Sequence, residues 1–233
     1  MKKLLPLLAL SGGCSIEDFC GKDLTSMTSE NFGANAVIDR SDGTFDAYSK
    51  PEPSSEMKIY AEDAEYRNAM ASIIEQYQAI LDTIDAETPK IALQDSYPDN
   101  YVCGDTSFHE EKAYYVCKSD DMNFAYENNG FTQSKLETCD FYSRAGFIAL
   151  YSQYLTDSTL LYETLAHEFG HVMELEHTTE VSNANLMDNG GLIDPELSIE
   201  MVNQKIGELA HALTCVYTNA CFDELSTPPA GWN

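Results

Sequence analysis

The most informative segment of the chain is His167-Glu168-Phe169-Gly170-His171-Val172-Met173-Glu174-Leu175-Glu176-His177, which contains three of the five histidines. His167 and His171 are four residues apart, so on a helix both side chains project from one face, about one turn apart. Residues 160–166 precede them and have the amphipathic pattern of a helix, Leu-Leu-Tyr-Glu-Thr-Leu-Ala. The segment therefore predicts a helix that carries two imidazoles side by side.

This pair of histidines predicts a zinc site. Two imidazoles one helical turn apart can both reach one tetrahedral zinc ion. Glu168 follows the first histidine and can reach a water molecule at the metal. A carboxylate in that place acts as a general base and later passes the proton to a leaving amine. A His-Glu-x-x-His pattern on a helix is therefore typical of zinc-dependent hydrolysis.

The third zinc ligand has more than one candidate. His177 lies six residues after His171, which is about 600° of helical rotation, so a continuing helix would point it away from the metal. It becomes a ligand only where the helix ends soon after His171 and the chain turns back. Glu174 shares a helical face with His167, but a rise of about 10 Å between them makes shared coordination difficult. We expect His177, rather than Glu174 or Glu176, to complete a site for one catalytic zinc ion.

Residues 167–187 resemble the active-site segment of the metzincin clan of zinc endopeptidases, and the matrixin-like members most. The clan motif is H-E-x-x-H-x-x-G-x-x-H followed by a methionine turn, and Asn185-Leu186-Met187-Asp188 is similar to that turn. The resemblance implies an α+β fold, in which a twisted, mostly parallel sheet has a backing helix, an active-site helix and a C-terminal helix. It also implies a protein or peptide substrate, Glu168 as the catalytic base, Met187 beneath the metal, and the zinc ligands His167, His171 and His177.

Glu174 departs from the clan pattern because it occupies the position of the motif's glycine. That glycine allows the positive φ of a sharp turn, where another residue costs about 1 kcal/mol of strain. We expect the helix to end near Met173 or Glu174, and Glu174 to adopt a positive φ. Asn189 is a second departure, since some relatives carry a tyrosine two residues after the methionine.

The remaining patterns predict both helices and strands. Residues 56–87 predict a long backing helix ended by Thr88-Pro89, with a buried stripe of Tyr66, Met70, Ile73, Tyr77, Ile80 and Ile84. Runs of β-branched and aromatic residues predict strands at 90–94, 101–103, 113–117 and 146–151. The resemblance implies that strand 146–151 is the sheet edge, where an extended peptide can pair. Asp157 or Ser158 is expected to cap the active-site helix, and a last helix to cover 196–213.

The chain is strongly acidic. Its 233 residues include 13 Lys and Arg against 39 Asp and Glu, a net charge of −26. Such a surface repels phosphate backbones and anionic membranes, which argues against a nucleic-acid partner. Residues 119–130 are rich in the oxygen ligands that calcium prefers, but they lack EF-hand spacing and favour a solvated loop. The composition is globular and leaves the oligomeric state open.

The N-terminus has the pattern of an export signal. Lys2 and Lys3 precede an apolar run from Leu4 to Leu10, and small residues lead into Cys14. The run is shorter than the roughly 20 residues of a membrane-spanning helix. Two outcomes are open, namely secretion after ordinary cleavage, or lipidation of Cys14 and attachment to a bacterial envelope membrane. We divide the chain into a signal (1–13), a tether or loosely attached arm (14–55) and a zinc metalloprotease domain (56–233).

The cysteines also favour export. None of the seven forms a C-x-x-C pair, which favours disulfides in an oxidising compartment over a structural zinc site. Without Cys14, six remain. Their spacing allows three pairs. Cys215 and Cys221 are close enough to pair locally, Cys103 and Cys117 can join adjacent strands, and Cys20 and Cys139 remain as the third pair. The connectivity is open at this point.

Two functions from different classes follow from these observations, and a zinc amidase or toxin-like hydrolase that acts on one defined substrate is a third alternative. The first is a zinc endopeptidase that hydrolyses peptide bonds with Glu168 as general base. The second is a non-catalytic, surface-binding lipoprotein that retains a protease fold, which Glu174 and the acidic surface motivate. The first predicts one bound zinc per chain, and the second predicts weak or absent zinc.

Overall fold

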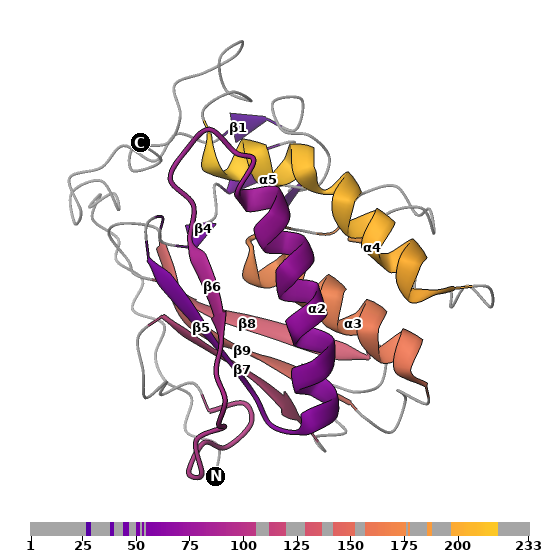
Figure 1. The fold of residues 1–233 in the computed structure, drawn as a ribbon. Coiled ribbons are helices and arrows are strands. Elements are labelled where there is room, and N and C mark those ends of the chain that lie inside the picture. Colours follow the sequence, from indigo (N-terminus) through magenta and orange to yellow (C-terminus); the bar gives the residue numbers. More distant parts are fainter. Residues whose placement is uncertain are drawn as a thin grey trace, which may run out of the picture.

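The fold is α+β, with helices packed against a mostly parallel sheet, as the sequence predicts (Figure 1). The computed structural model describes residues 27–28, 38–39, 44–46, 50–51, 53, 55–105, 112–119, 129–136, 142–151, 157–175, 177, 186–187 and 197–218. The predicted signal, Cys14, most of the predicted tether and residues 120–128 of the predicted loop lie outside this part of the chain. None of the described helices has the length and apolar character that crossing a bilayer requires.

The main sheet contains six described strands: β4 (Lys50–Pro51), β5 (Glu56–Ala61), β6 (Lys90–Leu93), β7 (Ala113–Lys118), β8 (Gly130–Leu136) and β9 (Tyr142–Leu150). Strands β6, β5, β7 and β9 are neighbours in that order and are parallel. β8 runs antiparallel along the outer side of β9, and the short β4 pairs with the start of β9. A separate small sheet has the order β1-β3-β2, from β1 (Met27–Thr28), β2 (Ile38–Asp39) and β3 (Thr44–Asp46).

The helices gather on one side of the main sheet (Figure 1). They are α2 (Ala64–Leu81), α3 (Ser158–Val172), α4 (Ile199–Glu208) and α5 (Ala210–Tyr217). Successive strand side chains point to opposite faces. Ile59, Val116 and Ile148 therefore join the buried helix residues in one core, whereas Tyr115 and Phe147 belong to a second cluster on the other face. In the larger core, α2 packs against α3.

The prediction of one helix over 56–87 is wrong at both ends. Residues 56–61 form strand β5, in which Met57, Ile59 and Ala61 are buried in alternation. The alternating pattern of this strand, with a period of two residues, comes directly before the helical pattern of α2. When residues 56–87 are considered as one stretch, the two patterns merge and the strand is hidden. The side chain of Asp63 caps α2 by accepting a hydrogen bond from the amide of Tyr66 at 2.9 Å. The helix then ends at Leu81, well before Thr88-Pro89.

Strands predicted at 90–94, 113–117 and 146–151 are confirmed as β6, β7 and β9, but two expectations about them are wrong. Residues 101–103 form a turn region rather than a strand. β9 is an inner strand between β7 and β8, so the edge strand on that side of the sheet is β8, which the sequence did not predict, while β6 forms the opposite edge. The last helix is divided at Leu209 into α4 and α5, after a cap at Ser198.

One predicted disulfide is confirmed. Cys103 and Cys117 are bonded, with their Cα atoms 5.6 Å apart. The bond joins the 101–105 turn to β7 rather than linking two strands. The other two predicted pairs each include cysteines outside the described residues.

Candidate metal centre

Helix α3 supplies the first two histidines. Asp157 caps its start by accepting a hydrogen bond from the amide of Leu160 at 2.7 Å, which confirms one of the two predicted caps. One side of the helix is buried in the core, and it includes Leu165, Phe169 and Val172. His167 and His171 are only partly buried. The core therefore fixes the rotation of the helix and leaves both imidazoles at the edge of the packed face.

Helix α3 ends where the third ligand requires it to end. Its last residue is Val172, and Glu174 adopts a φ of 65°. The amides of Glu174 and Leu175 donate hydrogen bonds to the carbonyls of His171 and Gly170, at 3.0 and 2.9 Å. This is the pattern of a Schellman motif with Glu174 in the left-handed position usually held by glycine. The predicted helix break and the predicted positive φ are both confirmed.

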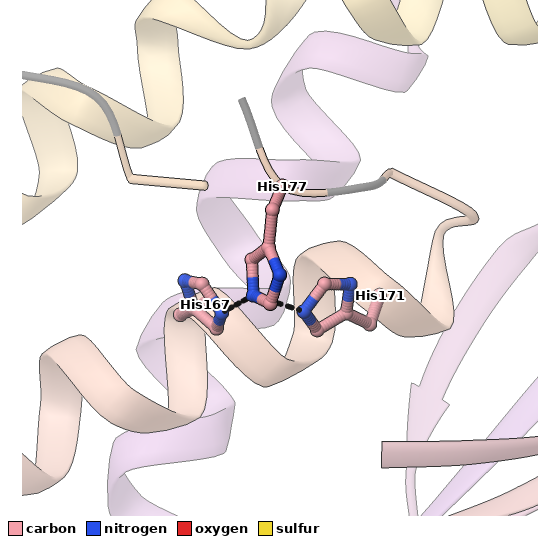
Figure 2. A group of neighbouring side chains, drawn as sticks. All are labelled: His167, His171 and His177. Atoms are coloured by element: carbon pink, nitrogen blue, oxygen red, sulfur yellow. Dashed lines mark hydrogen bonds between the residues drawn. The ribbon is translucent and has the colours of Figure 1, made fainter. Parts of the chain in front are cut away.

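The turn brings His177 back over the helix. Figure 2 shows its imidazole descending between those of His167 and His171. The Nε2 atom of His177 lies 3.1 Å from Nε2 of His167 and 3.2 Å from Nε2 of His171. Together the three residues offer ligand atoms that all lie within 4.8 Å of one another. The three histidines are thus positioned to hold one metal ion.

The hydrogen bonds of the other ring nitrogens make this cluster suitable for a cation. Nδ1 of His167 lies 2.6 Å from the carbonyl oxygen of Leu186, and Nδ1 of His171 lies 2.7 Å from that of Leu175. Carbonyls only accept, so each Nδ1 carries the proton and each Nε2 presents a lone pair. Nε2 of His177 can offer at most one proton to these two lone pairs. A cation among the three nitrogens satisfies all of them.

The spacing and protonation of the histidines fit zinc. Zn–N bonds of about 2.0–2.1 Å in a tetrahedron place neighbouring nitrogens about 3.3 Å apart, close to the two separations observed. Burial, together with the nearby His167 and His177, lowers the pKa of His171 to about 3. That imidazole therefore stays neutral, which is the form that binds metal. Three nitrogen ligands also leave a fourth position for water, as catalytic zinc sites do.

Met187 lies against the buried side of the ligand-bearing helix. Its side chain is fully buried, and a methyl group at Gly170 would overlap its sulfur. Leu186, the residue before it, provides the carbonyl that orients His167. The Leu186–Met187 segment therefore supports two consecutive turns of α3. The neighbouring Asn185, Asp188 and Asn189 lie outside the described residues.

Glu168 is buried beside β8. Its side chain is 6% exposed, and its Oε2 accepts a hydrogen bond from the Thr132 hydroxyl at 2.6 Å. Burial raises the pKa of Glu168 to about 7, and the bond from Thr132 opposes that increase. Sequence reasoning missed Thr132 and its neighbour Gly130, whose Cα faces this carboxylate. The only signal for them was a short Gly-Phe-Thr run of strand-forming residues after a polar loop.

Glu174 is not part of the group formed by the three histidines. Within the described residues, the group of ligand atoms close enough to share one ion contains the three histidines and not Glu174. Glu176 lies outside the described residues. No protein-family model matches the chain, and no curated protein is significantly similar to it.

The contact between Gly170 and Met187 generates a stability prediction. We expect Gly170→Ala to lower the free energy of unfolding by about 1–3 kcal/mol, because the added methyl overlaps a buried sulfur and the core must shift. Gly207→Ala on α4 is the matched control, since nothing lies within 4 Å of its added methyl. That control should raise stability by about 0.5–1 kcal/mol. Urea unfolding compares the two, and similar effects would contradict the close approach.

Proposed function

We propose that this chain is a zinc-dependent endopeptidase of the metzincin clan, matrixin-like in its active-site segment. The observation that carries the proposal is the convergence of three histidine Nε2 atoms, with Glu168 directly after the first of these residues. The left-handed turn at Glu174 and the buried Met187 support it, because both belong to the pattern that the sequence resembles. A mostly parallel sheet with an antiparallel edge strand is compatible with the fold of that clan.

His167, His171 and His177 would hold the zinc ion, which supplies a Lewis acid that acidifies a bound water and polarises a scissile carbonyl. The protein's own contribution begins with the two Nδ1 hydrogen bonds, which orient the imidazoles before any metal binds. Such preorganisation reduces the cost of assembling the site. It also keeps the two rings in the tautomer that binds metal.

Glu168 is the proposed general base. Its carboxylate removes a proton from the attacking water and delivers it to the leaving amine as the peptide bond breaks. Burial suits both steps because it raises the pKa of Glu168 toward neutral pH. A carboxylate with such a pKa can both accept a proton from the water and release it to the leaving amine. Zinc coordination and proton transfer are therefore assigned to adjacent residues of one helix.

The proposed substrate is an extended polypeptide that lies along β8. The support for this placement is that β8 forms the edge of the sheet beyond β9 among the described strands. Main-chain hydrogen bonds to an edge strand bind extended peptides with little dependence on their sequence. β8 also contacts α3, so a peptide added there lies near the histidines. This replaces the expectation that residues 146–151 receive the substrate.

We also propose that the protein is exported, either secreted or anchored through a lipid on Cys14. The signal pattern of residues 1–13 supports this, as does the Cys103–Cys117 disulfide, because such bonds persist in oxidising compartments. Mass spectrometry of the mature protein from producing cells should find residues 1–13 removed, with acyl mass added if Cys14 is lipidated. Retention of that segment would contradict export through this signal.

Replacing the general base tests the proposed reaction. We expect Glu168→Gln to reduce kcat/KM for casein cleavage by at least about 100-fold, because the amide cannot take the proton. Its zinc content, from elemental analysis, should match that of the wild type. Glu75→Gln, an exposed change on α2, is the control and should keep full activity. A chelator should abolish cleavage and added zinc should restore it.

Full activity of Glu168→Gln would contradict the mechanism. A wild-type protein that holds zinc but cleaves neither casein nor gelatin would contradict the function itself, and would favour the non-catalytic alternative.

A further inference from the structure

Strand β8 contacts the proposed general base through a side chain far away in the sequence. The Thr132 hydroxyl lies 2.6 Å from Oε2 of Glu168 and 3.0 Å from the backbone oxygen of the same residue, which is 36 positions later in the chain. A hydroxyl carries one proton, and the shorter contact is the one to the carboxylate. Two contacts to one residue fix the hydroxyl against both the side chain and the backbone of Glu168.

Gly130 leaves the space that the carboxylate occupies. A Cβ atom at this glycine would lie 2.8 Å from Oε1 and 2.9 Å from Cγ of Glu168. Gly130 and Thr132 are two residues apart, so they point to the same face of β8. Phe131 lies between them and contacts Phe147 on the opposite face. Strand alternation thus presents a gap and a hydroxyl to Glu168, and an aromatic ring to the other side.

A general base needs a fixed position and one oxygen available for the proton. A glutamate side chain has three rotatable bonds, and restricting them has an entropic cost. The Thr132 hydroxyl occupies one lone pair of Oε2, while a carboxylate has about four such sites. Oxygen lone pairs therefore remain for the proton of the attacking water. The hydrogen bond from Thr132 restrains the carboxylate and leaves it able to accept that proton.

From this geometry we propose that Thr132 is a positioning residue for Glu168, held in place by β8, with Gly130 providing the room. This inference rests on the proposed endopeptidase function. It makes the edge strand part of the proton-transfer machinery as well as the surface on which a peptide lies. By this proposal, Thr132 acts through Glu168 and does not touch the reacting atoms.

The test compares Thr132→Val, which keeps the shape but removes the hydroxyl, with Thr132→Ser, which keeps the hydroxyl. We expect Thr132→Val to lower kcat for casein cleavage by about 10- to 100-fold with KM changed less than about 3-fold, since general-base catalysis contributes about 10²–10⁴. Thr132→Ser should retain kcat within about 3-fold of wild type. Zinc affinity from competition with a chromophoric chelator should be the same in all three. Thr214→Val, which removes a hydroxyl bonded to the Ala210 carbonyl on α5, is the control and should leave kcat unchanged.

A second readout uses the metal-free protein. The Tm values of wild type, Thr132→Val, Glu168→Ala and the double variant form a thermodynamic cycle. We expect Thr132→Val to lower Tm by a few degrees in the wild type, because a buried carboxylate loses its donor, and by less in the Glu168→Ala background. Additive Tm changes would show that the two side chains are not coupled and would overturn the proposal.

The remaining outcomes separate this inference from the proposed function. Coupled Tm values with kcat unchanged in Thr132→Val would make the hydrogen bond structural only, and would overturn the positioning role while the endopeptidase function stands. Loss of activity in both Thr132→Val and Thr132→Ser would likewise overturn it, because the hydroxyl would not be what matters. A zinc-loaded wild type without activity would overturn both proposals.

Discussion

Glu174 adopts a φ of 65°, and the path of the chain from α3 to His177 depends on this one backbone conformation. For a residue with a Cβ atom, this left-handed conformation costs about 1–2 kcal/mol. The two Schellman hydrogen bonds satisfy amides and carbonyls at the helix end, and the neighbours Met173 and Leu175 are fully buried. Burying such a side chain stabilises by about 1.5–3 kcal/mol, enough to offset the strain. The Leu175 carbonyl also accepts from Nδ1 of His171, so the same turn orients a ligand.

The rest of the fold holds α3 at a fixed height and rotation. On the buried side, the Tyr77 hydroxyl of α2 donates to the carbonyl of Ala166 at 3.0 Å, and its ring meets Phe169 edge-on. Burial raises the pKa of Tyr77 well above its usual range, so the phenol stays a donor. Met187 packs against Gly170, one residue before a ligand. On β8, the Thr132 hydroxyl donates a hydrogen bond to the Glu168 carboxylate. Segments distant in the sequence thus support α3 and two of its chemically important side chains, His167 through the Leu186 carbonyl and Glu168 through Thr132.

The sequence predicts the site better than the fold around it, and the reason is physical. The spacing of His167, His171 and His177 sets a helix, a break and a return within eleven residues, so local geometry decides the outcome. Asp157 is a similar case, because a capping side chain acts on its own helix. The sheet depends instead on pairing between distant segments. β5 was hidden because its alternating pattern runs into the pattern of α2, and the place of β9 inside the sheet follows from partners that no local pattern identifies. For the same reason Thr132 could not be assigned to Glu168 from sequence.

The turn at Glu174 brings His177 to the two helical histidines, and we propose that the three residues together form a zinc site. Zinc affinity, measured by chelator competition together with elemental analysis, tests it most directly. We expect one zinc per wild-type chain and an affinity at least about 100-fold weaker in His177→Ala, since losing even an outer partner of a ligand weakens binding about 10- to 100-fold. His211→Ala, exposed on α5, should bind like the wild type. Equal affinities for wild type and His177→Ala, or a wild type that binds no zinc, would contradict a zinc site completed by His177.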